Sequence, residues 1–175
     1  MSGGARAGGL SRPAAVAAVA AVLGVSALVG RRNAPDPSHP RIRRWYHRLD
    51  KPAATPPDAV FGGVWPVLEA GLAIGGYRLL RRPADARRNL AVGLWLANTA
   101  MVGGWTELFF RRRALGASAA AAGAMTAGAV GYVAVAATVD RPAAATAVPF
   151  AAWLGFATLL AEGIRERNPV EPGGG

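Results

Sequence analysis

The sequence contains no cysteine, and its only histidines among 175 residues are His39 and His47. The lack of cysteine excludes disulfides, thiolate metal sites and cysteine nucleophiles. Both histidines lie in one arginine-rich loop, where exposed loop side chains are a better interpretation than metal or haem ligands. No phosphate-binding glycine loop and no catalytic triad is recognisable in the sequence. We therefore predict no metal site and no catalytic residue, and an enzyme is the less favoured class of function.

Charge is also scarce, because only 17% of the residues are charged, whereas soluble domains carry about 25%. The charges form short runs between long apolar stretches, which is typical of a polytopic membrane protein. A net charge of +10 would favour nucleic-acid binding if the arginines formed one stripe. Instead they flank the apolar stretches, where arginine anchors helices to lipid headgroups. We expect the lipid bilayer to be a partner, and no nucleic acid.

Five apolar segments are long enough to cross about 30 Å of hydrocarbon as helices, and none shows the alternation of a strand. They cover residues 13–30, 59–80, 89–110, 114–139 and 143–164. The predicted fold is all-α, an integral membrane bundle of five transmembrane helices. It forms a single domain (13–164) with one long loop (31–58), between an N-terminal tail (1–12) and a C-terminal tail (165–175). Short links at 81–88, 111–113 and 140–142 make consecutive helices antiparallel neighbours.

The first segment has two interpretations. Arg6 and Arg12 before an apolar run resemble a signal peptide, but Arg31 and Arg32 follow the run directly, as in a stop-transfer flank, and favour a retained helix. Of the 20 lysines and arginines, twelve lie in the long loop, the 111–113 turn and the C-terminus. By the positive-inside rule this end faces the cytoplasm and the N-terminus faces out. We expect a multi-pass protein of a bacterial cell membrane.

Small residues recur four positions apart in two of the segments. The pairs are Gly71 and Gly75, Ala124 and Gly128, and Ala127 and Gly131. Small residues at this spacing let helices approach closely, either within one bundle or across a homodimer. Both arrangements remain open from the sequence.

Three blocks of sequence carry a resemblance to a known family. The first runs from Trp45-Tyr46 through Leu49 and Lys51-Pro52 to Pro56-Pro57, Phe61 and Trp65, the second is Trp105-Thr106-Glu107-Leu108-Phe109-Phe110, and the third runs from Pro149-Phe150 through Trp153 to Phe156-Ala157-Thr158 and Leu160. Together, in this order, they resemble the tryptophan-rich sensory protein (translocator protein) family. The resemblance implies a membrane pocket for porphyrins, haem-related tetrapyrroles or sterols, and no cofactor other than such a ligand.

The chain departs from the family's pattern at several polar positions. Asn98 and Val102 stand where the family usually has glutamine and asparagine, Glu69 replaces a tyrosine, and Ala161 and Arg165 replace an asparagine and a tryptophan. The resemblance therefore predicts the fold more firmly than the ligand.

The long loop is stiff, because Pro52, Pro56 and Pro57 fix φ and favour extended geometry in the preceding residues. Trp45 and Tyr46 add large amphipathic rings to it. These rings fit either an interfacial aromatic belt or a rigid lid over the mouth of a pocket. The resemblance favours the lid.

Two tryptophans, Trp65 and Trp153, lie too deep in their helices for an interfacial belt. They fit either core packing or the walls of a pocket for a flat apolar ligand, and Pro149 is expected to kink the helix beside the second ring. The pocket is predicted between the second, third and fifth helices, under the long loop. The candidate ligand-binding residues are Tyr46, Pro56, Phe61, Trp65, Glu69, Asn98, Trp105, Trp153 and Ala157.

Glu69 lies near the middle of an apolar helix, where an ionised carboxylate costs about 2.5–3.5 kcal/mol. A neutral carboxylic acid could be hydrogen-bonded to Asn98, at matching depth on the next helix, or to a backbone carbonyl. Alternatively Glu69 lines the pocket and meets a polar group of the ligand. We favour the first interpretation. Near the membrane surface, Glu107 lies four residues before Arg111, which predicts a helical ion pair.

The leading prediction for function is a membrane-embedded binding protein or sensor for a porphyrin or sterol ligand. One alternative, which the resemblance implies, is light-dependent porphyrin breakdown with Trp65 and Trp153 as electron donors. Another is a small membrane transporter of tetrapyrroles. Transporters commonly contain internal repeats, and an odd number of helices without a repeat argues against this class.

Overall fold

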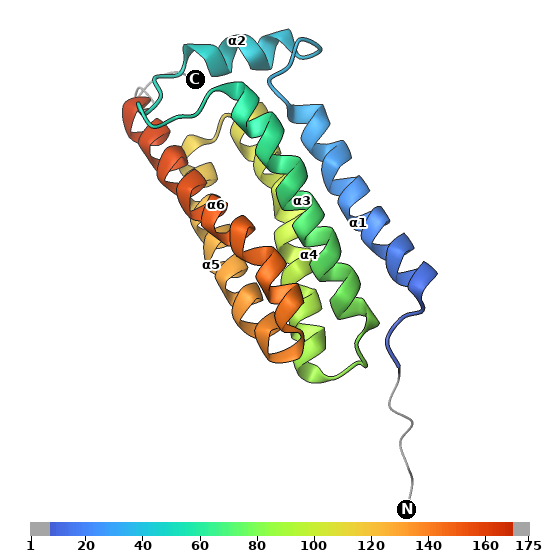
Figure 1. Ribbon diagram of the computed structural model, residues 1–175. Coiled ribbons are helices and arrows are strands. Elements are labelled where there is room, and N and C mark those ends of the chain that lie inside the picture. The colour runs from blue at the N-terminus through green and yellow to red at the C-terminus, as the bar shows by residue number, and fades with distance from the viewer. Residues whose placement is uncertain (1–7, 170–175) are drawn as a thin grey trace, which may run out of the picture.

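The computed structural model describes residues 8–169, so the outer parts of both predicted tails, including Arg6, lie outside the described residues. Five long helices form a bundle, and a short helix lies across one end of it (Figure 1). The helices are α1 (Arg12–Asn33), α2 (Pro40–Arg48), α3 (Asp58–Arg81), α4 (Ala86–Thr106), α5 (Leu115–Val139) and α6 (Arg141–Arg167), and a π-helical turn, η1 (Glu107–Arg111), continues α4. Residues 8–169 contain no strand, which confirms the all-α prediction.

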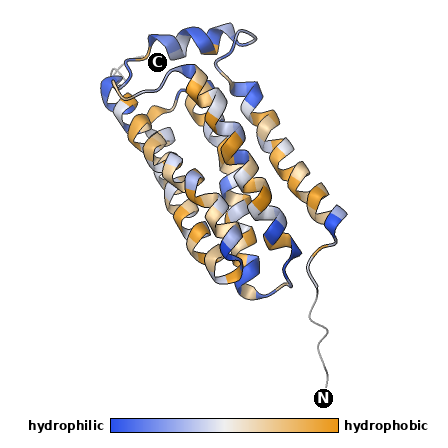
Figure 2. Cartoon of the chain, viewed as in Figure 1, coloured by the Kyte–Doolittle hydropathy of each residue, from blue (hydrophilic) through white to orange (hydrophobic). Residues whose placement is uncertain are grey.

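The hydropathy of the bundle is that of a membrane protein, with apolar helices and hydrophilic ends (Figure 2). α1, α3, α5 and α6 are each long and apolar enough to cross a membrane. α4 carries polar side chains within its length, but it packs against α1, α3 and α5. Its polar residues Asn98 and Thr99 are buried in these contacts. The predicted segments 13–30, 59–80 and 143–164 lie within α1, α3 and α6, whereas 114–139 begins one residue before α5 and 89–110 runs through α4 into η1.

The helices begin at a short polar side chain that accepts a hydrogen bond from a backbone N–H of the first turn, or at a proline, which has no N–H to pair. Ser11 accepts a hydrogen bond from the Ala14 N–H at 3.3 Å, and Asp85 accepts one from the Arg88 N–H at 2.8 Å. Such caps satisfy backbone donors that a helix leaves unpaired at its N-terminus. Proline occupies the first turn of α1, α2 and α6, where its missing N–H is not needed.

The 31–58 segment contains a helix that the sequence analysis did not predict. α2 turns Tyr46 into a buried cluster with Phe109, Leu115 and Ile164, on the end of the bundle. The arginines of α2 stay exposed. The loop is therefore an amphipathic helix followed by a proline-rich strap, residues 49–57.

Two glycines of α3 allow close contact with α5 and α6. A Cβ on Gly71 would lie 2.5 Å from the carbonyl oxygen of Thr146, and a Cβ on Gly75 would lie 2.6 Å from the hydroxyl oxygen of Tyr132. No larger residue fits at these positions without a shift of the helices. This pair of small residues therefore serves packing within the bundle, whereas a homodimer stays a prediction.

Trp95 joins α4 to α3 in the centre of the bundle. Its side chain is 1% exposed, and its ring lies so close to Gly76 that a Cβ there would be 2.4 Å from two ring carbons. The indole N–H donates a hydrogen bond to the Leu72 carbonyl at 2.9 Å. On the other side of α4, the Ser26 hydroxyl of α1 donates to the Thr99 carbonyl at 2.7 Å. These polar contacts fix α1 and α3 against α4 without leaving their donors unpaired.

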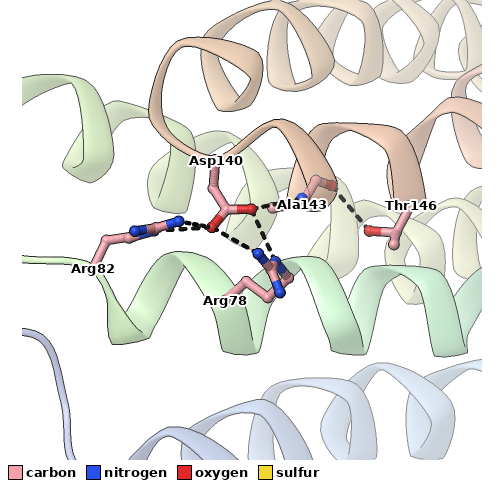
Figure 3. A network of polar contacts seen from close by, with 5 residues as sticks. All are labelled: Arg78, Arg82, Asp140, Ala143 and Thr146. Carbon is pink, nitrogen blue, oxygen red and sulfur yellow. Dashed lines mark hydrogen bonds and ion pairs between the residues drawn. The ribbon is translucent and has the colours of Figure 1, made fainter.

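Asp140 forms the whole link between α5 and α6, a turn at the end of the bundle opposite α2 (Figure 1). Figure 3 shows its polar contacts. Its carboxylate accepts hydrogen bonds from Arg78 Nε at 2.8 Å, from Arg82 Nη2 at 2.6 Å, and from the Ala143 N–H at 2.9 Å. Burial by itself raises the pKa of Asp140, but these hydrogen bonds outweigh burial and hold the pKa below its ordinary value. The network ties the α5–α6 turn to the end of α3.

Candidate ligand-binding site

An apolar groove runs between α3 and α6, in the half of α3 nearer to α2. Its volume is about 550 Å³, within the range of about 300–1,000 Å³ that small-molecule sites occupy. Because Pro149 has no N–H, the helix leaves one backbone carbonyl without its usual partner beside the groove. The groove is lined by Gly63, Val64, Val67 and Leu68 of α3 and by Pro149, Ala152, Trp153 and Phe156 of α6.

Two aromatic rings, those of Trp153 and Phe156, line this groove, and the Phe61 ring lies against Trp153. The Phe61 and Trp153 ring centroids are 5.7 Å apart with an interplanar angle of 74°, and those of Trp153 and Phe156 are 5.6 Å apart at 53°. All three side chains are half-buried, so parts of their surfaces remain open. Rings arranged in this way offer dispersion and stacking contacts to a flat apolar molecule.

A second aromatic cluster lies under α2 and is built around buried Phe109. Trp105 is stacked on Phe109 with centroids 4.8 Å apart, and its indole N–H donates to the Ser118 carbonyl at 2.8 Å. Tyr46 meets Phe110 edge-on at 5.5 Å, and burial raises the pKa of its hydroxyl. Two of the predicted site residues, Tyr46 and Trp105, thus hold α2 on the bundle rather than line the groove.

The strap, residues 49–57, is fastened to the end of α6. The Asp50 N–H donates to Asn168 Oδ1 at 3.0 Å, and Asn168 Nδ2 donates back to the Asp50 carbonyl at 2.8 Å. Pro52 lies against Gly163, so that a Cβ on this glycine would be 2.7 Å from the proline Cγ. The strap, with Pro56 half-buried within it, crosses from the end of α6 to the start of α3, the two helices that line the groove (Figure 1).

The polar candidates Glu69 and Asn98 do not meet. Asn98 is 3% exposed, donates to the Leu94 carbonyl at 2.9 Å, and lies against Gly128 of α5. Glu69 is half-buried on α3, and no hydrogen bond of its side chain occurs within residues 8–169. The expected hydrogen bond between Glu69 and Asn98 is therefore wrong, because Asn98 faces α5.

The remaining candidates lie near the groove or behind it. Trp65 is half-buried and packs against the main core, and it is not among the residues that line the groove. Ala157 is half-buried on α6, four residues after Trp153. The structure therefore brings Phe61 and Trp153 together, and the residues that line the groove come from α3 and α6 without α4.

The predicted ion pair between Glu107 and Arg111 is also wrong. Glu107 Oε1 lies 3.6 Å from Arg112 Nε, the residue five positions later. The last turn of this helix is π-helical, which brings residue i+5 rather than i+4 over residue i.

Sequence reasoning missed Val64, Val67 and Leu68 as groove residues. These positions, with spacings of three and four, share one face of a helix, and Ala152 and Phe156 repeat that spacing around Trp153 on α6. The helical spacing of these residues was thus visible in the sequence. An apolar transmembrane helix has no distinct polar face, however, so the sequence does not show which of its apolar faces lines a groove.

The comparisons with known proteins agree with this architecture. A family model described as the TspO/MBR family matches residues 15–167. The chain is 30% identical over 134 residues to the translocator protein of Bos taurus, covering 75% of this chain and 79% of that protein. It is 31% identical over 120 residues to that of Ovis aries and 32% identical over 123 residues to that of Homo sapiens, each covering 67% of this chain and 70% of the relative. The chain, a multi-pass membrane protein, belongs to the TspO/MBR family.

Proposed function

We propose that the protein binds a flat, largely apolar ligand of the porphyrin or sterol type in the groove between α3 and α6. The observation that carries this proposal is the pair of rings, Trp153 and Phe156, that lines one open apolar groove, with the Phe61 ring against Trp153. A flat ring system gains dispersion contacts with such a surface on its whole face. The strap joins the two helices that line the groove, and we propose that it acts as the lid.

A pair of glycines provides the test. Gly63 lines the groove and Gly93 lies on the outer face of α4, and at both positions a Cβ meets nothing within 4 Å. A leucine therefore fits at either position, and both substitutions raise helix propensity by a similar amount, about 1 kcal/mol. Only Gly63→Leu places a side chain in the groove.

Binding is measured by tryptophan quenching during titration with protoporphyrin, haem and cholesterol in detergent micelles. We expect Gly63→Leu to weaken binding at least about tenfold, since about 1.4 kcal/mol of lost contact suffices, and Gly93→Leu to bind like the wild type. Equal affinities for the two variants and the wild type would rule out the groove as the site. Flat titrations with all three ligands would rule out the binding function.

The position of Trp153 also favours a second function, light-dependent breakdown of bound porphyrin. Trp153 lines the groove, where its ring can donate an electron to a photoexcited porphyrin, whereas Trp105 is stacked on Phe109 under α2. Trp153→Phe is expected to slow the loss of porphyrin absorbance under illumination, and Trp105→Phe to leave it unchanged. The same rate of decay in both variants and the wild type would remove this function.

We further propose that the end with α2 faces the cytoplasm, since the twelve-to-eight excess of cationic residues lies there. The absence of native cysteine makes single cysteines informative. Exposed Ser38 lies at the α2 end, and exposed Ala84 at the other. An impermeant thiol reagent is expected to label Ala84→Cys in intact cells and Ser38→Cys only after permeabilisation. The reverse pattern would invert the orientation.

A further inference from the structure

Exposed arginines without a carboxylate partner gather at the α2 end of the bundle. Arg41 and Arg48 of α2 and Arg113, after η1, are all exposed, and none of their side chains forms an ion pair or hydrogen bond within residues 8–169. At the opposite end, by contrast, Arg78 and Arg82 share the carboxylate of Asp140. The end of a transmembrane bundle lies at the membrane surface, so unpaired guanidinium groups there are available to an anion outside the protein.

Arg113 lies over one aromatic ring, that of Trp45, and Arg41 and Arg48 are helical neighbours of this residue on α2. Arg41 precedes Trp45 by four residues and Arg48 follows it by three, so both lie beside it on one face of α2. The guanidinium carbon of Arg113 lies 5.5 Å from the centre of the Trp45 ring, and the ring is held edge-on against Phe109 at 5.7 Å. Two elements far apart in the sequence thus place one cation over the Trp45 ring and two more beside Trp45 on α2.

The strained backbone conformation of Arg113 supports a functional role for this arrangement. Arg113 has φ of 54°, the left-handed conformation, and it is the only residue other than glycine with a positive φ within residues 8–169. This conformation costs a side-chain-bearing residue about 1–2 kcal/mol, and glycine would avoid the cost. The chain keeps an arginine there, with its guanidinium over the Trp45 ring.

We propose that Arg41, Arg48 and Arg113 form a binding site for the phosphate of an anionic phospholipid, with Trp45 at the headgroup level. Guanidinium groups bind phosphate oxygens in a bidentate manner, and tryptophan is the residue that prefers the membrane–water interface. A lipid is favoured over a soluble anion because the site lies where η1 ends and α5 begins, at the edge of the apolar part of the bundle.

The test uses two triple variants that change the net charge equally. Arg41→Gln, Arg48→Gln and Arg113→Gln are combined in the test variant. The control combines Arg12→Gln, Arg87→Gln and Arg141→Gln, three exposed arginines near the opposite end that also form no ion pair within residues 8–169. Native mass spectrometry counts the phosphatidylglycerol and phosphatidylcholine molecules that stay bound to each protein.

Each arginine near an anionic surface contributes roughly a fivefold factor in binding, so the test variant is expected to bind phosphatidylglycerol about 100-fold more weakly than the wild type. The control variant is expected to bind as the wild type does, and phosphatidylcholine to bind all three proteins alike. An equal loss in the control, or no preference for phosphatidylglycerol in the wild type, would overturn the proposal.

Two further measurements separate the site from its surroundings. Arg113→Gly relieves the backbone while removing the guanidinium, so it is expected to keep or raise the thermal midpoint and still to weaken phosphatidylglycerol binding about fivefold. Unchanged lipid binding by this variant would exclude Arg113 from the site. Displacement of the lipid by inorganic phosphate or by an acidic peptide at the same concentration as the lipid would show that the site serves a soluble anion, and the proposal would fail.

Discussion

Replacing Asp140 with alanine removes the N-cap of α6 and both arginine contacts in one step. A helix N-cap contributes about 1 kcal/mol. Hydrogen bonds to a charged group contribute about 1.5–3 kcal/mol each when buried, but the Arg78 and Arg82 side chains are 37% and 49% exposed and are resolvated in the variant, so we allow about 1 kcal/mol for each. The expected loss in the free energy of unfolding is therefore about 3 kcal/mol.

Asp85 offers a matched control, since it caps α4 through the Arg88 N–H at 2.8 Å and forms no ion pair within residues 8–169. Asp85→Ala should cost about 1 kcal/mol, the value of a cap alone. The measurement is unfolding by sodium dodecyl sulfate in mixed micelles, followed by tryptophan fluorescence. If Asp140→Ala and Asp85→Ala lose the same stability, the two arginines contribute nothing and the reasoning is refuted.

Two further predictions concern the same helices. Because the pKa of Asp140 lies below its ordinary value, its stabilisation is complete above the unfolded-state pKa of about 3.9 and is lost as the pH falls through the folded-state pKa. The difference in the free energy of unfolding between wild type and Asp140→Asn should thus be constant from about pH 8 to 5 and shrink below about pH 4. A difference that grows on acidification would contradict the lowered pKa of Asp140. Gly76→Ala, whose Cβ would lie 2.4 Å from the Trp95 ring, should cost about 1–3 kcal/mol in the same unfolding assay. Gly93→Ala, in open space, should stabilise by up to about 1 kcal/mol, and equal effects would refute the close contact.

The bundle could be predicted from the sequence because apolar length alone determines which segments can cross a membrane. α2 could not, since its nine residues interleave arginines with aromatic residues, and its apolar face is satisfied only by the end of the bundle. The available signal was Pro40, a proline suited to the first turn of a helix. Asp140 had a similar signal, an acidic residue followed by Arg141-Pro142, which is typical of a helix start.

For the candidate site, the sequence blocks of the family resemblance predicted neighbouring residues better than the depth of each residue in the membrane did. Phe61 and Trp153 lie together as two blocks of the family resemblance suggested. Glu69 and Asn98 were paired by depth alone, which leaves the rotation of each helix undetermined, and Asn98 turns toward α5. The Glu107 ion pair failed because a π-helical turn depends on the packing of the Phe109 ring and its neighbours, and a local pattern of charges does not encode it.

The most direct test of the proposed groove is fluorine NMR of protein labelled with 5-fluorotryptophan, titrated with protoporphyrin. The chain has five tryptophans, and single substitutions by phenylalanine assign their resonances. A porphyrin in the groove between α3 and α6 should shift the Trp153 resonance most, by its ring current, and leave that of Trp95, buried between α3 and α4, in place. An unmoved Trp153 resonance, together with a shift of Trp45 or Trp105 under α2, would contradict the account.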